Sequence, residues 1–192
     1  MSFSFLDFLV DTNFDQKGRL ARLVPALIGL NTQVGAGIDA GACLSYKDGV
    51  GKVYGQNAVF IADASEALQT ESEYFHIKNV KVHYLTVGDT FDFKLRRPTT
   101  TKAPISPSIT GFSDSSNILS SFECTRLLTR LIDQLGLENL GKTQIPSGKG
   151  YPTSTPAFSM LFYKDAETRG YKSGNIYSAT SVRLDISAES RM

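Results

Sequence analysis

The sequence predicts an α/β protein with a β-rich C-terminal portion. A short apolar run at residues 4–10 is followed by helical spacing at 20–28, several short apolar runs then alternate with turn residues, and a second helical stretch precedes two further apolar runs. The chain has 192 residues, of which 41% are hydrophobic and 20% charged. This length and composition are typical of one globular domain with a substantial core.

The first two predicted elements are a buried strand and an amphipathic helix. Residues 4–10, SFLDFLV, are short and apolar, as expected for a buried strand. Asn13 or Asp15 is expected to cap the following helix, and Pro25 is expected to kink it or to shift its start. The apolar positions with helical spacing are Leu20, Leu23, Val24, Leu27 and Ile28.

A run of strands is predicted next. Asp48-Gly49 supplies a hairpin turn between the first two. Val80, Val82 and Tyr84 alternate with polar residues, which predicts a half-buried strand. The predicted strands of this run cover residues 36–46, 52–55, 58–63, 80–87 and 90–95.

The remainder is predicted as a loop, a helix and two closing strands. Residues 97–116 are rich in Pro, Thr and Ser, which favours a loop. Helical spacing then covers about 117–135, with Gly136 as the expected C-cap. A Gly/Pro/Ser stretch follows at 141–156, and alternation at 157–163 and 181–186 predicts a closing strand pair.

Composition excludes several classes of function. A net charge of +1 gives no indication of a nucleic-acid partner. No run reaches the roughly 20 apolar residues of a membrane span, the apolar start lacks the cationic region of a signal peptide, and nothing indicates a compartment. The two cysteines, Cys43 and Cys124, are expected to be buried free thiols, and two His with two Cys argue against structural zinc. No cofactor or metal is predicted.

Residues 136–143 match the pattern of a phosphate-binding P-loop, but their context does not. Such a loop needs a preceding strand and a following helix, whereas here a predicted helix precedes and Pro146 follows. We therefore expect a helix C-cap and a turn, with Leu137 and Leu140 anchored in the core. The histidines, His76 and His83, are expected at the surface or its rim.

Several motifs occur in the order found in the cyanophycinases, peptidase family S51, and the chain resembles that family. The family segment D-Q-H-F-x-x-R-x-R-L-x-R-L is similar to residues 11–23, DTNFDQKGRLARL, and the family motif G-I-D-E-x-T-A is similar to Gly37 through Ala42. Further similar elements are the turn and strand Gly55–Asp63, the signature Leu85-Thr86-Val87-Gly88-Asp89, and Lys164-Asp165-Ala166-Glu167-Thr168-Arg169-Gly170-Tyr171.

The resemblance implies a fold and an activity. The family fold is a three-layer α/β/α sandwich like that of the class I glutamine amidotransferases. Residues 1–96 would be the C-terminal half of such a domain, 97–116 a loop, and 117–192 a helix and a closing β pair packed on it. Family enzymes are serine peptidases in which a His acts as general base, and cyanophycinases cut a poly-aspartate bearing arginine side chains.

The chain departs from the family at the residues that perform the chemistry. Asn13 stands at the position of the catalytic His, and an amide has no titratable nitrogen near neutral pH. By the resemblance, the nucleophilic Ser of the family and the acidic residue of its triad both lie upstream of the segment with which this chain begins. Lys17 stands at the position of the first arginine of the segment, and a lysine lacks the guanidinium group that donates in bidentate fashion. We therefore assign no catalytic residue, and we predict a substrate-pocket remnant made of Asp11, Asn13, Lys17, Arg19 and Arg22.

The cations of this segment leave two interpretations open. On a helical wheel Arg19 and Arg22 lie about 60° apart while Lys17 points elsewhere. The pair is then either a solvated helix face or, with Asp11, a brace that shapes a concave site.

Half of an S51 domain would expose a sheet edge, so a complementing N-terminal half or partner chain is expected to cover it. A homo-oligomer is also compatible with such an edge. Three functions remain: a degenerate S51-like domain used for binding or assembly, the C-terminal part of an active peptidase acting on Asp/Arg-rich or β-aspartyl peptides, and a purely structural subunit.

Overall fold

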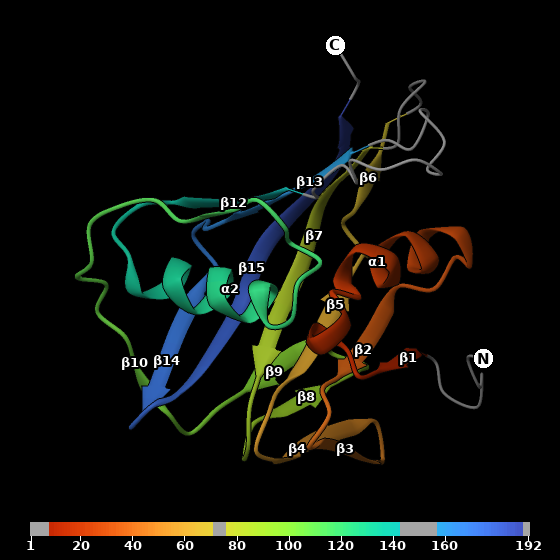
Figure 1. The fold of residues 1–192 in the computed structure, drawn as a ribbon. Coiled ribbons are helices and arrows are strands. Elements are labelled where there is room, and N and C mark those ends of the chain that lie inside the picture. The colour runs from red at the N-terminus through yellow and green to blue at the C-terminus, as the bar shows by residue number, and fades with distance from the viewer. Residues whose placement is uncertain (1–7, 71–75, 143–156, 190–192) are drawn as a thin grey trace.

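A large mixed sheet forms the centre of the molecule, with two α-helices on one face (Figure 1). The structure, a computed structural model, describes residues 8–70, 76–142 and 157–189. Strands β1 and β2 are parallel, as are β11 and β12, and every other pairing in the sheet is antiparallel. The sheet therefore has the mixed character expected of an α/β protein.

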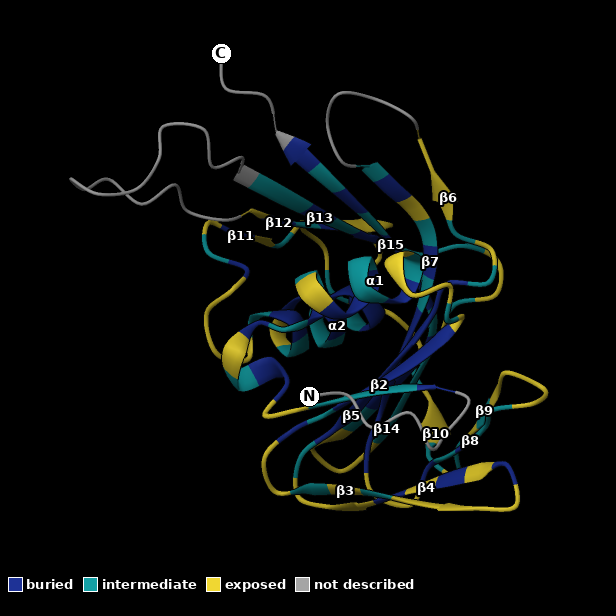
Figure 2. Cartoon of the chain, turned by 90° about the vertical axis from the view of Figure 1, so that its right-hand side faces the viewer, coloured by how far each residue is buried: buried dark blue, intermediate teal, exposed yellow. Residues whose placement is uncertain are grey.

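The strand order of this sheet is β1-β2-β5-β7-β15-β13-β12-β11, and β6, β10 and β14 pair beside that path. The long neighbours β7 and β15 lie at its centre and are buried along most of their length (Figure 2). The strands are β1 (Leu9–Thr12), β2 (Val34–Ile38), β5 (Val59–Asp63), β6 (Leu68–Gln69), β7 (His76–Leu85), β10 (Ala103–Pro104), β11 (Asp114–Ser115), β12 (Glu138–Lys142), β13 (Ala157–Tyr163), β14 (Arg169–Ser173) and β15 (Ile176–Glu189).

Both helices bury apolar stripes against the same sheet face. Helix α1 (Leu20–Gly29) and helix α2 (Glu123–Asp133) share one core with alternate residues of β7 and β15. The helical spacing of both segments is thus confirmed, and Pro25 lies inside α1. This core includes Leu20, Leu23, Leu27, Val80, Val82, Leu127, Leu128, Leu131, Leu184 and Ile186.

The helix boundaries differ from those predicted. Helix α1 begins after Arg19 and has no side-chain cap, so neither Asn13 nor Asp15 caps it. Asp15 instead lies in a 3₁₀ turn, η1 (Asp15–Lys17), which ends at left-handed Gly18. Helix α2 begins after Phe122, itself left-handed at φ 62°, and ends at Gln134 rather than at Gly136.

The opposite sheet face carries a second sheet of order β3-β4-β8-β9 over part of its area. A separate apolar core lies between the two sheets. No helix covers this face among the described residues, so the predicted three-layer α/β/α sandwich is not confirmed. The physical reason is that β2, β5 and β7 are antiparallel neighbours, which need no crossover helices. The strands are β3 (Ala42–Lys47), β4 (Val50–Gly55), β8 (Thr90–Asp92) and β9 (Arg97–Thr99).

The second sheet explains two errors of the sequence analysis. His83 was expected near the surface, but it is fully buried under this sheet, with its ring 5.3 Å from that of Phe91. Burial, reinforced by the charges of Lys81 and Arg183, lowers the pKa of His83 to about 3. Cys43 was expected to be buried but is exposed on the outer face of β3, opposite Tyr54, whereas Cys124 is buried as predicted.

The segment that mimics a P-loop is a strand. Residues 138–142 form β12 between β11 and β13, so the expected C-cap and turn are wrong. A strand in this place agrees with the rejection of a phosphate-binding loop. Leu137 is 63% exposed rather than anchored in the core, and Leu140 is half-buried. The last motif residue, Thr143, lies outside the described residues. The predicted loop at 97–116 contains the short strands β9, β10 and β11, and β14 was not predicted.

No helix in the described residues is long and apolar enough to cross a bilayer.

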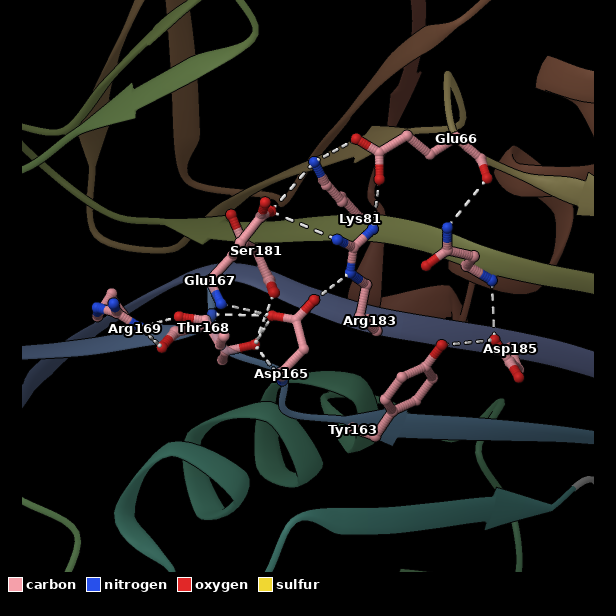
Figure 3. Close-up of polar contacts among 12 residues, drawn as sticks. Glu66, Lys81, Tyr163, Asp165, Glu167, Thr168, Arg169, Ser181, Arg183 and Asp185 are labelled. Carbon is pink, nitrogen blue, oxygen red and sulfur yellow. Dashed lines mark hydrogen bonds and ion pairs between the residues drawn. The ribbon is translucent and has the colours of Figure 1, made fainter.

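A charged network covers the remaining part of the face opposite the helices (Figure 3). Arg183 of β15 donates to Asp165 at 2.6 Å and to Glu66 at 2.9 Å, and Lys81 of β7 contacts Glu66 at 2.6 Å. Asp165 also accepts from the backbone and hydroxyl of Thr168, so the first part of the family-like element at 164–171 is a turn that contains this carboxylate, and its last residues begin β14. The element stabilises the sheet and does not contribute to the candidate site described below.

A buried ion pair fixes the signature at residues 85–89. Asp89 is fully buried and accepts from Lys102 Nζ at 2.7 Å, from Ser178 Oγ at 2.5 Å and from the backbone of Thr86 at 2.9 Å. These contacts join the turn after β7 to β15 and to the segment after β9. Removing one partner leaves a buried charge uncompensated.

Lys102→Met should therefore lower the free energy of unfolding by about 3 kcal/mol. The matched control is Lys94→Met, because Lys94 is exposed and has no charged partner among the described residues; it should change stability by less than about 0.5 kcal/mol. Urea denaturation of both variants measures the difference. Equal stabilities would show that the buried pair contributes nothing.

Candidate functional site

The segment after β1 lies at the carboxyl edge of two parallel strands. Phe14 is fully buried and its ring lies on Gly37 of β2, where an added Cβ would come within 2.4 Å of the ring. The amide of Phe14 also donates to the carbonyl of Ile38. Asn13 precedes this anchor, is exposed, and has a left-handed φ of 49°. The packing of Phe14 on glycine therefore fixes where the Asn13 side chain leaves the sheet edge.

Asp11 and two arginines form a brace across this edge. Arg22 donates in bidentate fashion, from Nε to Oδ2 of Asp11 at 2.7 Å and from Nη2 to Oδ1 at 2.5 Å. Arg19 Nη1 donates to Oδ1 of Asp11 at 3.1 Å and to the carbonyl of Thr12. The side chain of Asp11 is only 13% exposed. Of the two interpretations of these cations, the structure thus contains the Asp11–arginine brace.

An open depression of about 300 Å³ lies beside the brace. Lys17 was expected to point away from the arginines, but it lies in η1 before left-handed Gly18, where the helical wheel does not apply. All three cations therefore line one depression, and Asn13 does not line it. The lining residues are Lys17, Gly18, Arg19, Ala21, Arg22, Leu119 and Phe158.

A buried pair of carboxylates lies beneath this surface and was not anticipated as a pair. Asp15 is 1% exposed and Asp39 3% exposed, and the Asp15 amide donates to Oδ1 of Asp39 at 2.8 Å. Oδ2 of Asp15 accepts from the amide of Thr125, in the first turn of α2, at 2.9 Å. Asp15 was expected to cap a helix; it caps α2 from a distant part of the chain.

Burial sets the acidity of both carboxyl groups. Desolvation raises the pKa of Asp39 to about 6 and also raises that of Asp15, and the mutual repulsion of the pair adds to the effect on Asp39. Neither group is placed to bind a metal: the described parts of the chain contain no set of three or more His, Cys, Asp or Glu side chains that could hold an ion.

Ala40 follows Asp39 at the same edge. Strands β1 and β2 run in parallel, so the residues after Thr12 and those after Ile38 meet at one end of the sheet. The Ala40 amide donates to Oε1 of Gln16 at 3.3 Å, which joins the two turns. Asn13 and Ala40 thus belong to the turns that follow two adjacent strands at one end of the sheet.

The candidate site of this α/β protein thus lies at the carboxyl edge of the parallel pair β1 and β2. No family model matches the chain. It is similar to the cyanophycinase of Synechococcus elongatus, with 33% identity over 95 residues, covering 46% of this chain and 30% of the relative. It is also similar to the cyanophycinase of Trichormus variabilis, with 30% identity over 92 residues, covering 44% of this chain and 31% of the relative.

The cyanophycinase of Geminocystis herdmanii is 29% identical over 99 residues, covering 48% of this chain and 36% of the relative. The chain thus spans about a third of the length of the curated relatives that it matches. Over about half of its length the chain is thus similar to cyanophycinases, which supports a cyanophycinase-like (S51) relationship.

The buried carboxyl pair predicts a pH dependence of stability. The folded protein retains the proton of Asp39 up to about pH 6, whereas the unfolded chain releases it near 3.8. Between these values the free energy of unfolding should therefore fall as pH rises, and Asp39→Asn, which keeps an acceptor oxygen, should remove on the order of 2 kcal/mol of that fall. Urea unfolding from pH 4 to pH 7 measures it, with exposed Asp48→Asn as the control. An unchanged slope in Asp39→Asn would contradict the assignment.

Proposed function

We propose that this chain is a degenerate cyanophycinase-like domain, a pseudoenzyme that serves binding or assembly rather than hydrolysis. The observation that carries the proposal is Asn13, which stands at the carboxyl edge of β1 where the family segment has its His. An amide cannot accept the proton of a serine nucleophile. Loss of one triad member alone removes several orders of magnitude in rate.

Neither histidine of the chain replaces the missing base. His83 is buried on the sheet face opposite Phe14 and α1, and its Nδ1 accepts from the amide of Ser181 at 3.2 Å. His76 lies at the start of β7, nine residues from Leu85, which pairs through β5 with the edge that carries Asn13. At about 3.3 Å per residue this places His76 roughly 30 Å away along the strand.

A second departure supports the proposal. The acid of the triad was expected upstream, but the family motif also has an acidic residue where this chain has Ala40, in the turn after β2 at the same sheet edge as Asn13. A general-base imidazole needs a carboxylate to orient it and to stabilise its charged form. Within the described residues the edge thus has an amide at position 13 and no acidic side chain at position 40, while the Asp11 brace and its depression are present. What is left at this edge resembles a binding surface more than a reaction centre.

Two alternatives have weaker support. An active S51-type peptidase acting on Asp/Arg-rich or β-aspartyl peptides, with this chain as its C-terminal part, is favoured by the match of Asp11, Arg19 and Arg22 to the family segment. That reading requires a general base from another polypeptide. A purely structural subunit is favoured by the charged network around Arg183, in which the cations of Arg183 and Lys81 are both used by ion pairs within the chain.

The proposal includes a complementing polypeptide and the organisation of the chain. Within the described residues β1 pairs only with β2, so a parallel strand forms one edge of the sheet. Parallel strands are rarely left at an open edge. We propose that a further α/β segment adds to β1, that residues 1–96 form the C-terminal half of the S51-like domain, and that 117–192 packs on that half after the 97–116 connection.

Hydrolysis assays test the first part. The purified chain should show no turnover of cyanophycin or of β-aspartyl peptides, and neither should Asn13→His alone. With the complementing segment present, Asn13→His combined with Ala40→Glu should raise hydrolysis above either single variant, because each restores one partner of the same pair. Turnover by the unaltered chain would contradict degeneracy. Equal activity of all four proteins would show that the base assignment is wrong.

Hydrogen exchange tests the second part. Amides of β1 that face away from β2 should exchange rapidly in the dilute isolated chain, because they lack a partner strand. Addition of the complementing segment should protect them, while amides of β5, which is buried between β2 and β7, should remain protected throughout. Full protection of β1 in the isolated chain at every concentration would exclude an open edge.

A further inference from the structure

The depression beside α1 has a cationic side and an apolar side. The cations come from the family-like segment, whereas the apolar residues Leu119 and Phe158 come from the distant 117–192 part of the chain. The two sides meet at Gly18, where an added Cβ would lie 2.5 Å from the Cα of Leu119. This close backbone approach requires glycine and holds the two sides in a fixed relation.

The cationic side has donors that the protein does not use. The single carboxylate of Asp11 balances one of the three cations, which leaves a net charge of +2 around the depression. Lys17 is exposed, and within the described residues its ammonium makes no hydrogen bond or ion pair. Arg22 uses Nε and Nη2 on Asp11, and its Nη1 makes no hydrogen bond among the described residues. Unused donors on two adjacent cations favour a carboxylate ligand.

The apolar side restricts what that carboxylate is attached to. Leu119 is 43% exposed, and Ala21 and Phe158 are half-buried beside it. An aliphatic group that covers Leu119 removes apolar surface from water, which is favourable. A guanidinium group in the same place would face a net positive surface and would cover apolar carbon with charge. A volume of about 300 Å³ is at the small end of ligand sites.

We propose that this depression binds a carboxylate whose neighbouring carbon carries a short aliphatic side chain, the chemistry of a peptide ending in leucine or of a free N-acylated leucine. The carboxylate contacts Lys17 and Arg22, and the aliphatic side chain covers Leu119 and Phe158. The inference rests on the proposed binding role of this segment and names the class of ligand.

Calorimetric titration with N-acetyl-leucine tests the proposal. N-acetyl-leucine should bind, and N-acetyl-leucinamide should bind at least tenfold more weakly, because the amide lacks the charge that Lys17 and Arg22 recognise. Acetate, which has the charge but no side chain, should also bind at least tenfold more weakly. Equal affinity for acid and amide, or no binding of N-acetyl-leucine or of a pentapeptide ending in leucine, would overturn the inference.

Two variants locate the binding. Lys17→Gln should weaken N-acetyl-leucine about tenfold or more, and Leu119→Ser should weaken N-acetyl-leucine but leave acetate unchanged. Lys47→Gln is the matched control, because Lys47 is an exposed lysine on the outer face of β3 and should leave affinity unchanged. Unaltered affinity in Lys17→Gln, or the same loss in Lys47→Gln, would overturn the assignment to this depression.

Two further ligands and a hydrolysis assay test the proposed class of ligand separately from the proposed function. N-acetyl-aspartyl-arginine should bind more weakly than N-acetyl-leucine, and the reverse order would overturn the inference. A pentapeptide ending in leucine distinguishes a protein terminus from a small acid, and binding of either supports the site. Hydrolysis is measured separately: turnover by the chain would refute the degenerate domain whatever binds, whereas absent binding without turnover would refute only this ligand.

Discussion

The capping of α2 by Asp15 is the contact on which the candidate site depends. Asp15 lies in the turn between β1 and α1, yet its carboxylate accepts from the amide of Thr125 and its carbonyl accepts from Phe122. Phe122 itself provides no side-chain cap, so α2 relies on this distant acid to satisfy its first turn. Ser121 adds a hydrogen bond from its hydroxyl to the carbonyl of Gln16. The turn region after β1, which carries Asn13, is therefore joined to the start of α2.

Two features follow from this junction. The loop before α2 is drawn against Gly18, which places Leu119 beside the cations and creates the depression. The same junction excludes water from Asp15 and Asp39, which raises the pKa of both carboxyl groups. The depression is thus a product of the later part of the chain as much as of the family-like segment, and a ligand that differs from that of the relatives is physically reasonable.

The hydrophobic pattern of neighbouring residues was sufficient to predict several individual strands and helices. The strands at 58–63 and 157–163 and the apolar stripes of both helices agree with β5, β13, α1 and α2, because hydrophobic periodicity is a property of neighbouring residues. Of the candidate site, the sequence predicted the Asp11–arginine brace as one of two interpretations.

The failures share a different cause: each depends on residues that are distant in the sequence. His83 is buried because the second sheet folds over β7. Asp15 caps a helix that begins more than a hundred residues later, as its contact with Thr125 shows. Lys17 joins the arginines because Gly18 interrupts the helix, a conformation that helical spacing does not report.

Electrostatics connects the two departures at the sheet edge. The buried pair Asp15 and Asp39 already holds two carboxyl groups in close proximity, with desolvation opposing their ionisation. An acidic side chain at position 40 would add a third carboxylate beside them, and its repulsion is offset only if a cationic imidazolium forms at position 13. With Asn13 in that position no such cation exists, so the neutral Ala40 avoids an unbalanced negative charge. Within the proposed degenerate domain we therefore expect the two positions to be coupled, with each substitution best accommodated in the presence of the other.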